Sequence, residues 1–314
     1  MDLFVEQYRG TSTMIQFNDQ DLTAKVIRSF ETTPDERLKF LLQETVTAVH
    51  DLVRRTNPTI AEWNQAITFL TRTGQTCTPL RQEFILLSDV LGISMLVDAV
   101  NQPEREGATE TTVLGPFYVG EHRPTPHGAY LSNGIEGAPM FVQSRVTNLA
   151  GVPLAGAEID VWHADDNGFY DSQKPDYEQQ GPSLRARFVA DADGRFSFRT
   201  ILPCSYPIPT DGPVGDLMAA TGRHAMRPAH VHFLLKAEGH LPLITHVFLD
   251  GDEYLASDAV FGVKDELVAR VELRTEPVLP TGEVISSPWH LLSYHFRMKP
   301  GADAVPGPMM SLSE

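Results

Sequence analysis

The sequence predicts an α+β protein, mainly β, in which a helical N-terminal domain precedes an antiparallel β-sandwich. Residues 34 to about 100 place apolar side chains at helical spacing, whereas after about residue 105 short β-branched and aromatic runs are broken by glycine, proline and Asx turns. Strands that follow helices, instead of alternating with them, are typical of a sandwich attached to a helical domain. We therefore expect a helical domain over residues 1–105, a sandwich over 106–300 and a C-terminal tail over 301–314.

Three helices are expected in the first part of the chain. The first begins at Thr33–Glu36, which has the capping-box pattern with proline at the first helical position. The second begins at Thr59–Glu62, where the pattern recurs, and Gly74 marks its expected end. The third spans Phe84–Val100 and is apolar nearly all round, which is typical of a helix buried by its neighbours or by a second subunit. Because this apolar surface exceeds what one small bundle can hide, we expect a homodimer.

Short β-branched and aromatic runs in the second part predict strands, and Asn-Gly and Asp-Gly pairs supply the turn signals. The predicted strands are Met140–Val146, Ala157–Ala164, Arg195–Thr200, His230–Lys236 and Thr245–Leu249. No helix-length pattern lies between them, so we expect strands alone in this part.

Composition limits the ligands and the location of the protein. The 314 residues carry a net charge of −16, which argues against nucleic acid and acidic membrane surfaces as partners, because both require a basic face. The two cysteines, Cys77 and Cys204, are typical of a chain from a reducing cytoplasm. The first residues lack the basic start and apolar run of a signal peptide, and Asp89 and Asp98 interrupt the most apolar stretch. We expect small ligands, a cytoplasmic location and no membrane insertion.

A His-x-His pair, His230 and His232, lies within one of the predicted strands. Side chains two residues apart in a strand point to the same face, so both imidazoles can bind one metal ion from a rigid element. The pair alone does not identify the ion, because it also occurs in zinc hydrolases, in cupins and in proteins without metal.

Two tyrosines upstream of the histidine pair stand in unusual settings. Tyr170 follows the Asn167-Gly168 turn, and Tyr206 lies in a rigid proline-rich loop. A single tyrosine is usually a core or surface residue, but two of them beside a histidine pair favour a metal site. A phenol titrates at about pH 10, so only a strongly Lewis-acidic ion such as Fe(III) would hold it ionised at neutral pH. Zinc would favour cysteine, histidine or carboxylate, and ferrous iron would favour two histidines and a carboxylate.

Four spaced motifs carry a resemblance to a known family. The motifs are Leu114–Tyr118, Asp160–Ala164 with Gly168–Tyr170, Ser205–Pro209, and Gly222–His224 with Arg227–His232. Together they resemble the intradiol ring-cleaving dioxygenases, and the similarity covers essentially the whole chain. The resemblance implies one Fe(III) per subunit, with Tyr206 and His232 as the axial ligands and Tyr170 and His230 as the equatorial ones.

The resemblance also implies catalytic roles. A catechol-type substrate would bind the iron through two adjacent oxygens and displace Tyr206, which would then take a substrate proton and so act as ligand and base in turn. Oxygen would attack the ring, and its insertion between the two oxygenated carbons would give a cyclic anhydride that opens to a muconate. Arg227 would stabilise negative charge on the ring. The alternative for Arg227 is a structural salt bridge.

The segment Tyr206–Gly215 looks like that of the hydroxyquinol 1,2-dioxygenase subgroup, and His246 stands where catechol 1,2-dioxygenases typically have glutamine. This resemblance implies cleavage of hydroxyquinol (1,2,4-trihydroxybenzene) by O₂ to 3-hydroxy-cis,cis-muconate, which tautomerises to maleylacetate. The implied substrate-binding residues are Leu86, Asp89, Val113, Leu114, Gly115, Pro116, Phe117, Ile208, Pro209, Arg227, His246 and Val260. Asp89 has support of its own, since an acid in an apolar helix needs a donor such as a third ring hydroxyl. Otherwise Asp89 would face solvent or cap a neighbouring backbone.

Alternatives stay open at this point. The substrate could be catechol or a chlorocatechol. The chain could be a cupin-type enzyme or a zinc hydrolase that uses His230, His232 and an acid such as Glu238, although neither accounts for the tyrosines. It could also be a non-enzymatic, transthyretin-like β-sandwich carrier. The N-terminal helices of the resembled family form a dimer that often holds a phospholipid, so lipid at such an interface is a further expectation.

Overall fold

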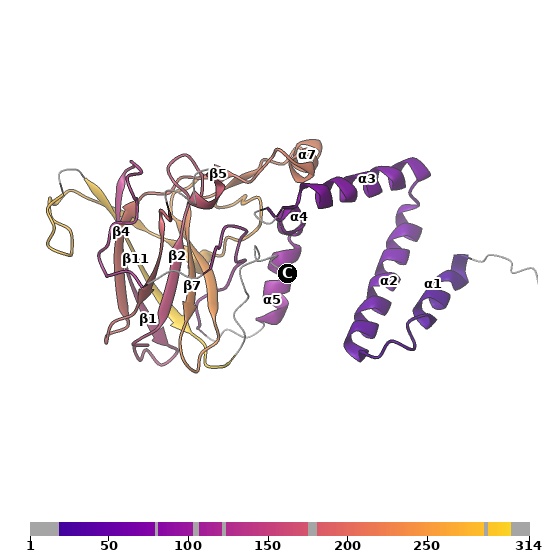
Figure 1. Cartoon of the computed structure of the whole chain (residues 1–314), viewed down its shortest axis with the longest axis horizontal. Coiled ribbons are helices and arrows are strands. Elements are labelled where there is room, and N and C mark those ends of the chain that lie inside the picture. The colour runs from indigo at the N-terminus through magenta and orange to yellow at the C-terminus, as the bar shows by residue number, and fades with distance from the viewer. Residues whose placement is uncertain are drawn as a thin grey trace, which may run out of the picture. The chain divides into compact units, whose positions relative to one another are not determined.

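The computed structural model describes residues 19–78, 81–102, 107–120, 124–174, 181–285 and 288–302. Its contacts divide the chain into two compact units, Met1–Thr68 and Phe69–Glu314 (Figure 1). Residue 105, where we expected the domain boundary, falls inside the second unit, so the helices that follow residue 69 share this unit with the sandwich. Among the described helices, none is long and apolar enough to cross a membrane.

The first unit contains α1 (Asp19–Arg28), α2 (Glu36–Thr56) and the start of α3 (Ile60–Thr76). α1 was not expected from the sequence. It contacts α2 through Thr23 Oγ1, which lies 2.9 Å from His50 Nδ1. The apolar side chains of α2 and α3 are about half exposed: Leu38, Leu41, Val49, Leu52, Val53, Trp63, Ile67 and Leu70. Both helices therefore carry apolar faces that the described residues leave about half exposed.

One of the two predicted capping boxes is confirmed. Thr59 and Glu62 form the predicted capping box at α3, in which each side chain accepts the other residue's backbone N–H, at 3.2 and 2.7 Å. At α2 the cap is Asp35 and not Thr33, because the Asp35 carboxylate accepts two backbone N–H groups of the first turn. The predicted end of α3 at Gly74 is also wrong, since the helix continues for two residues beyond it.

The apolar stretch predicted as one helix over Phe84–Val100 forms two helices, α4 (Glu83–Val90) and α5 (Ile93–Asn101). The break lies at Gly92, whose φ of 71° is left-handed and interrupts the helical hydrogen-bond ladder. α4 buries one face, whereas α5 exposes most of its apolar side chains: Ile93, Leu96, Val97 and Val100.

The second unit is built on a sandwich of two sheets (Figure 1). The four-stranded sheet has the order β10 (Val271–Arg274), β11 (Trp289–Met298), β1 (Pro139–Asn148), β4 (Arg195–Ile201). The five-stranded sheet has the order β3 (Arg185–Val189), β2 (Glu158–Trp162), β7 (His230–Lys236), β8 (Leu243–Leu249), β9 (Val268–Ala269). Neighbouring strands are antiparallel, except that β1 runs parallel to β11 and β8 parallel to β9. The expected sandwich is present, with parallel pairing at these two places.

All five predicted strands are present, and their ends lie within two residues of the expected positions. β3 and β11 were not expected. β3 escaped notice because Arg185 and Arg187 interrupt its apolar pattern, yet both arginines are buried against the carboxylates of Asp171 and Asp160. A buried position that is occupied by a charged residue and its ion-pair partner does not add to the apolar pattern from which a strand is predicted.

The core lies between the two sheets. Phe188 of β3 stacks on Phe198 of β4 with ring centroids 5.3 Å apart. β7 contributes three fully buried side chains to this core, Val231, Phe233 and Leu235. Because side chains alternate along a strand, the other face of β7 presents His230 and His232. A packed core therefore fixes the backbone of the histidine pair.

A short ladder of β5 (Tyr206–Pro207) and β6 (Met226–Arg227) lies outside the two sheets. Between these strands runs α7 (Pro213–Ala220), so the expectation that no helix lies among the strands is wrong. Proline at the first helical position starts α7, and its eight residues are too few to give a clear helical period. The short helices η1 (Asp171–Gln173) and η2 (Asp265–Leu267) complete the described elements.

Candidate metal centre and active site

The four predicted iron donors meet on the face of the five-stranded sheet that points away from the core. His230 and His232 lie on β7, Tyr170 directly precedes η1, and Tyr206 opens β5. All four are buried. Gly168 has a φ of 84°, and a Cβ at this residue would lie 2.4 Å from the Cβ of Tyr206. Glycine is therefore required where the turn before Tyr170 crosses Tyr206.

The donor atoms of these four residues converge on one point. Tyr170 Oη lies 2.9 Å from both Tyr206 Oη and His232 Nε2. His230 Nε2 lies 3.1 Å from His232 Nε2 and 3.4 Å from each phenol oxygen. Metal–ligand bonds of about 2.0–2.1 Å place neighbouring ligand atoms about 3 Å apart. The spacing fits a single metal ion at the common centre.

The protonation of the donors also fits a cation. His230 Nδ1 donates to the carbonyl of Pro228 at 2.7 Å, so its Nε2 carries the lone pair that faces the centre. Burial lowers the pKa of His230 to about 3 and that of His232 well below 6.5, which keeps both rings neutral. Burial raises the pKa of Tyr170 and Tyr206 above 10, so both phenols keep their protons unless a strong Lewis acid replaces them.

Aromatic contacts fix the rotation of the donor rings. Trp162 stacks on His232 with ring centroids 4.7 Å apart and an interplanar angle of 14°. Phe117 stacks on Tyr170 at 4.5 Å. Gly115, with a φ of 76°, packs against His232, because a Cβ there would lie 3.1 Å from the ring. These rings exclude water around the donors and hold them in place.

Arg227 lies beside the donor cluster with its guanidinium buried. It faces Tyr206 across the β5–β6 ladder, and its Nη1 lies 3.3 Å from His230 Nε2. Its Nε lies 3.1 Å from Asp258 Oδ1. Burial alone would raise the pKa of Asp258, but the Arg227 charge holds it below 3.8. The salt bridge given as the alternative role of Arg227 is therefore present, its guanidinium also lies beside the donor cluster, and Asp258 was not expected from the sequence.

His246 is a third buried histidine at this site. One nitrogen each of His230, His232 and His246 lies within 4.8 Å of the others. However, Arg227 Nη2 lies 3.4 Å from His246 Nδ1, and a guanidinium can only donate, so Nδ1 accepts and the ring proton is on Nε2. The structure places His246 at the site, as expected, but as a neighbour of the ligands.

The expected substrate-binding residues fall into two groups beside the donors. Leu86, Ile208 and Val260 pack together with parts of α4 and α7 in one apolar cluster. In the segment 113–117, Leu114 belongs to the cluster that contains Tyr170 and Tyr206, and Phe117 packs against that cluster. Val113 and Pro116 belong to the segment 113–117, and Pro209 directly follows Ile208.

Asp89 lies on α4 between Leu86 and Val90, two members of the first of these groups. It is buried, and its Oδ1 has no hydrogen-bond partner among the described residues. Burial raises its pKa to about 6, against the opposing effects of Ser94 and of the Arg227 charge. The alternatives in which Asp89 faces solvent or caps a backbone are therefore wrong, because a buried acceptor without a partner requires a donor from elsewhere.

The cupin or zinc-hydrolase alternative loses its third ligand. Glu238 is exposed in the turn after β7, six residues beyond His232. At about 3.3 Å per residue along a strand, its carboxylate cannot reach an ion held by His230 and His232.

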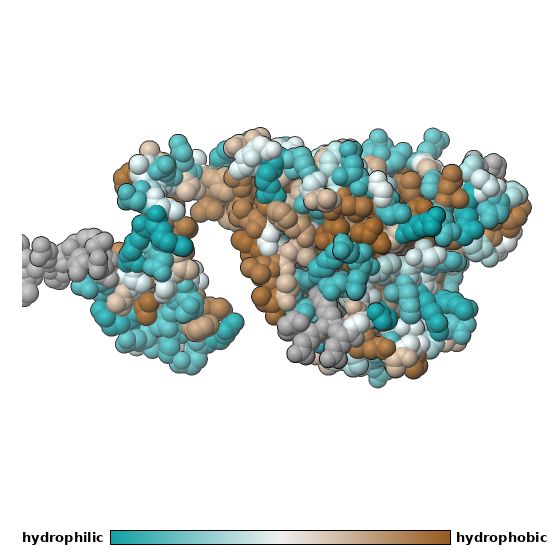
Figure 2. Space-filling model, turned by 180° about the vertical axis from the view of Figure 1, so that it is seen from behind, coloured by the Kyte–Doolittle hydropathy of each residue, from teal (hydrophilic) through white to brown (hydrophobic). Residues whose placement is uncertain are grey.

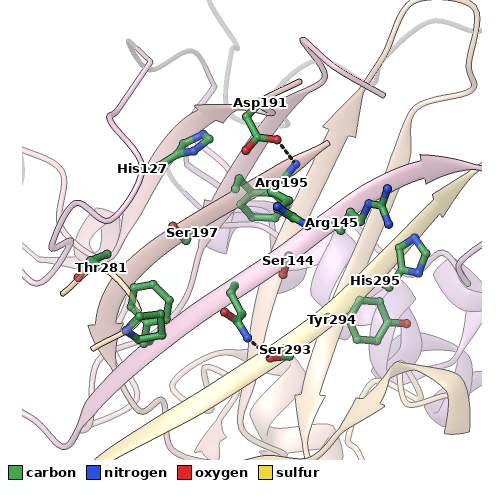
Figure 3. A pocket seen from close by; sticks show the side chains of 14 residues that line it. His127, Ser144, Arg145, Asp191, Arg195, Ser197, Thr281, Ser293, Tyr294 and His295 are labelled. Carbon is green, nitrogen blue, oxygen red and sulfur yellow. Dashed lines mark hydrogen bonds between the residues drawn. The ribbon is translucent and has the colours of Figure 1, made fainter. Parts of the chain in front are cut away.

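A separate pocket of about 590 Å³ lies on the four-stranded sheet (Figure 3). Arg145, Arg195 and His295 line it, with Asp191 at its edge. Asp193 holds both arginines, since its carbonyl accepts from Arg145 Nε at 3.0 Å and its carboxylate pairs with Arg195 at 3.1 Å. None of the predicted site residues lines this pocket, so it is distinct from the donor cluster.

Known proteins are similar to this chain over most of its length. The family described as "Dioxygenase" matches residues 113–299, and "Catechol dioxygenase N terminus" matches residues 35–109. The chain is 50% identical over 256 residues to a 6-chlorohydroxyquinol 1,2-dioxygenase of Cupriavidus pinatubonensis, covering 81% of this chain and 92% of that protein. It is 43% identical over 286 residues to a hydroxyquinol 1,2-dioxygenase of Nocardioides simplex, covering 91% and 97%. The solved structure of a hydroxyquinol 1,2-dioxygenase from Pseudomonas putida DLL-E4 superposes with a TM-score of 0.83 at 44% identity, covering 90% of this chain and 99% of that one.

Proposed function

Because this chain belongs to the intradiol ring-cleavage dioxygenases, we propose that it cleaves hydroxyquinol with O₂ to 3-hydroxy-cis,cis-muconate, which tautomerises to maleylacetate. The observation that carries the substrate assignment is Asp89, a buried carboxylate with an unpartnered oxygen in the apolar group of Leu86, Ile208 and Val260. The names of the similar proteins support the same ring, with or without chlorine.

Each subunit holds one Fe(III) through Tyr170, Tyr206, His230 and His232. The donor spacing of 2.9–3.4 Å and the neutral histidines support this set. Bound Fe(III) supplies Lewis acidity, which ionises phenols and draws electron density from an aromatic diol. Two phenolates suit this ion better than zinc, for which cysteine, histidine or carboxylate would serve.

Several residues of the chain have separate roles around the bound ring. Tyr206, at the start of β5, would be one of the residues that hold the iron and would take a proton from a ring hydroxyl of the bound diol. Arg227 directs its Nη1 toward the donors and stabilises negative charge on the ring oxygens. His246 and Phe117 pack against the ligands and keep water out.

Asp89 selects the third hydroxyl. With a pKa of about 6 it is mostly ionised at neutral pH and accepts a hydrogen bond from the hydroxyl that catechol lacks. Catechol would leave Oδ1 of this carboxylate buried without a donor, and such sites disfavour the analogue by up to about 10⁴-fold. Leu86 and Val260 contribute the apolar wall around it.

The test is kcat/KM for hydroxyquinol, catechol, 4-chlorocatechol and chlorohydroxyquinol, in the natural chain and in Asp89→Ala. We expect a strong preference for hydroxyquinol that Asp89→Ala erodes. Asp98→Ala is the matched control, because Asp98 is the other acid of this apolar stretch but pairs with Lys264 at 3.2 Å. A natural chain that prefers catechol would refute the substrate assignment. An unchanged ratio in Asp89→Ala would show that Asp89 does not read the third hydroxyl.

Assembly and location complete the proposal. The exposed apolar faces of α2, α3 and α5 support a homodimer through the helical region over residues 1–105, with the catalytic domain at 106–300 and a tail at 301–314. Figure 2 shows apolar surface of this kind gathered along the larger unit. A phospholipid at the dimer interface would cover part of it. The free thiols of Cys77 and Cys204 support a cytoplasmic location.

A further inference from the structure

The Arg227 guanidinium is held by a carboxylate to which the proposed function gives no role. Arg227 Nε lies 3.1 Å from Asp258 Oδ1, and Nη2 lies 3.4 Å from Oδ2. This side-by-side contact occupies one edge of the guanidinium and leaves Nη1 facing His230 Nε2 at 3.3 Å. The direction in which Arg227 points at the donors is therefore set by Asp258.

The loop that carries Asp258 holds the carboxylate without help from the donors. The backbone N–H of Gly262 donates to Oδ2 at 2.9 Å, and that of Val260 donates to Oδ1 at 3.3 Å. A Cβ on Gly262 would lie 3.2 Å from Oδ2 and 3.3 Å from Arg227 Nη2. Glycine at this residue thus lets the backbone close over the ion pair.

Arg223 connects the same loop to α4. Its Nη1 donates to the carbonyl of Val90 at 2.6 Å, and its Nη2 donates to the carbonyl of Ala259 at 3.0 Å. Val90 directly follows Asp89, and Ala259 directly follows Asp258. The carboxylate proposed to read the substrate and the carboxylate that holds Arg227 are therefore joined by one side chain.

The charge of the Arg227 guanidinium is a second reason to assign a role to Asp258. A guanidinium buried without a partner is strongly disfavoured, and here it would also repel a trivalent cation. Asp258 cancels this charge while leaving Nη1 free to donate. Resting on the proposed function, we infer that Asp258 is a positioning residue for ring cleavage: it aims Arg227 at the ring oxygens held at the donor cluster and neutralises it there.

Asp258→Asn tests the inference in the iron-loaded protein, because asparagine keeps the shape of the side chain and removes its charge. We expect kcat for hydroxyquinol to fall about 10²-fold, as for other misplaced charge stabilisers. KM should change less than about threefold, because Asp258 acts through Arg227. The reduction potential of the iron should rise, since an unpaired positive charge nearby favours Fe(II). Asp250→Asn is the control, because it alters an exposed carboxylate that accepts the Val271 N–H at 2.8 Å. It should leave kcat, KM and the reduction potential unchanged.

A double variant separates positioning from a general structural role. In an Arg227→Met background, Asp258→Asn should change kcat less than about threefold, because no guanidinium remains to be aimed. The inference is wrong if Asp258→Asn alone leaves kcat and the potential at their natural values. It is equally wrong if the loss in kcat is as large in the Arg227→Met background.

If Asp258→Asn binds iron poorly, the iron content of the single and double variants provides the test. The double variant has no unpaired buried charge, so it should recover the iron that the single variant loses. A double variant as poor in iron as the single one would overturn the inference. Iron binding and hydroxyquinol turnover by the natural chain test the proposed function separately. In an active, iron-replete enzyme, an Asp258→Asn variant with natural behaviour refutes this inference alone.

Discussion

Replacing Asp89 by asparagine should stabilise the protein at neutral pH. The carboxylate is buried on α4, and its Oδ1 has no hydrogen-bond partner in the part of the chain that the structure describes. Burial raises its pKa from 3.8 to about 6. Between these two values the unfolded chain has lost the proton that the folded chain still holds. The stability that the protonated group contributes is therefore complete below pH 3.8 and is lost as the pH rises through 6.

The pKa difference sets the size of the effect. At about 1.4 kcal/mol for each tenfold change, ionised Asp89 costs about 3 kcal/mol of unfolding free energy at pH 7.5 and about 1 kcal/mol at pH 4.5. Asparagine carries no charge at either pH. Its own burial cost does not depend on pH, so it cancels when the two pH values are compared. The advantage of Asp89→Asn should therefore be about 2 kcal/mol larger at pH 7.5 than at pH 4.5.

Urea unfolding at both pH values, followed by tryptophan fluorescence on metal-free protein, measures this difference. Asp216→Asn is the control, because Asp216 is 62% exposed and its pair with Arg72 is a surface salt bridge. We expect no comparable pH-dependent gain in the control. A change below about 0.5 kcal/mol between the two pH values in Asp89→Asn would refute the reasoning, because the carboxylate would then not be desolvated. A confirmed gain would mean that the residue is kept for substrate selection at the expense of stability.

The other predictions concern the metal, the assembly and the core. His230→Ala and His232→Ala should each lose iron and the colour expected of tyrosinate bound to Fe(III), as metal analysis and absorption spectra would show; full iron with full activity would contradict the ligand set. Light scattering should give twice the chain mass of 34.8 kDa, and a strictly monomeric mass would exclude the homodimer. Gly168→Ala should lower iron occupancy, because its Cβ would lie 2.4 Å from that of Tyr206, and natural occupancy would argue against this crowding. Phe188→Ala should cost about 3–5 kcal/mol in urea unfolding, since the ring is fully buried between sheets; a loss below about 1 kcal/mol would contradict the packing.

Much of the fold could be predicted because its signals are local. A β-branched and aromatic run located the strand that carries His230 and His232, and the Thr59–Glu62 box located the start of α3. The break at Gly92 was missed, because the apolar pattern continues on both sides of a residue whose backbone is left-handed. β3 was missed because its buried arginines are neutralised by acids from other parts of the chain.

The site divides in the same way. The spacing of His230 and His232 and the chemistry of two phenols pointed to the metal, and the resemblance supplied the set of four donors. Asp258 could not be found from the sequence, because it lies 31 residues from Arg227 and no periodicity links the two. An aspartate followed by glycine four residues later is common in loops. The role of Asp258 depends on the Arg227 guanidinium, which lies next to it only in the folded chain.

The parallel pairing of β1 with β11 has a consequence for synthesis. Gln143 and Ser293 are neighbours across this pair although 150 residues separate them, and β11 occupies the place between β10 and β1. While the ribosome is still making the chain, one edge of β1 stays unpaired and the apolar face of its sheet is only partly covered. Contacts of such long sequence separation form slowly. A polypeptide that stops before Trp289 would therefore lose an interior strand and not a tail, and it would leave the ribosome with an open sheet edge prone to aggregation.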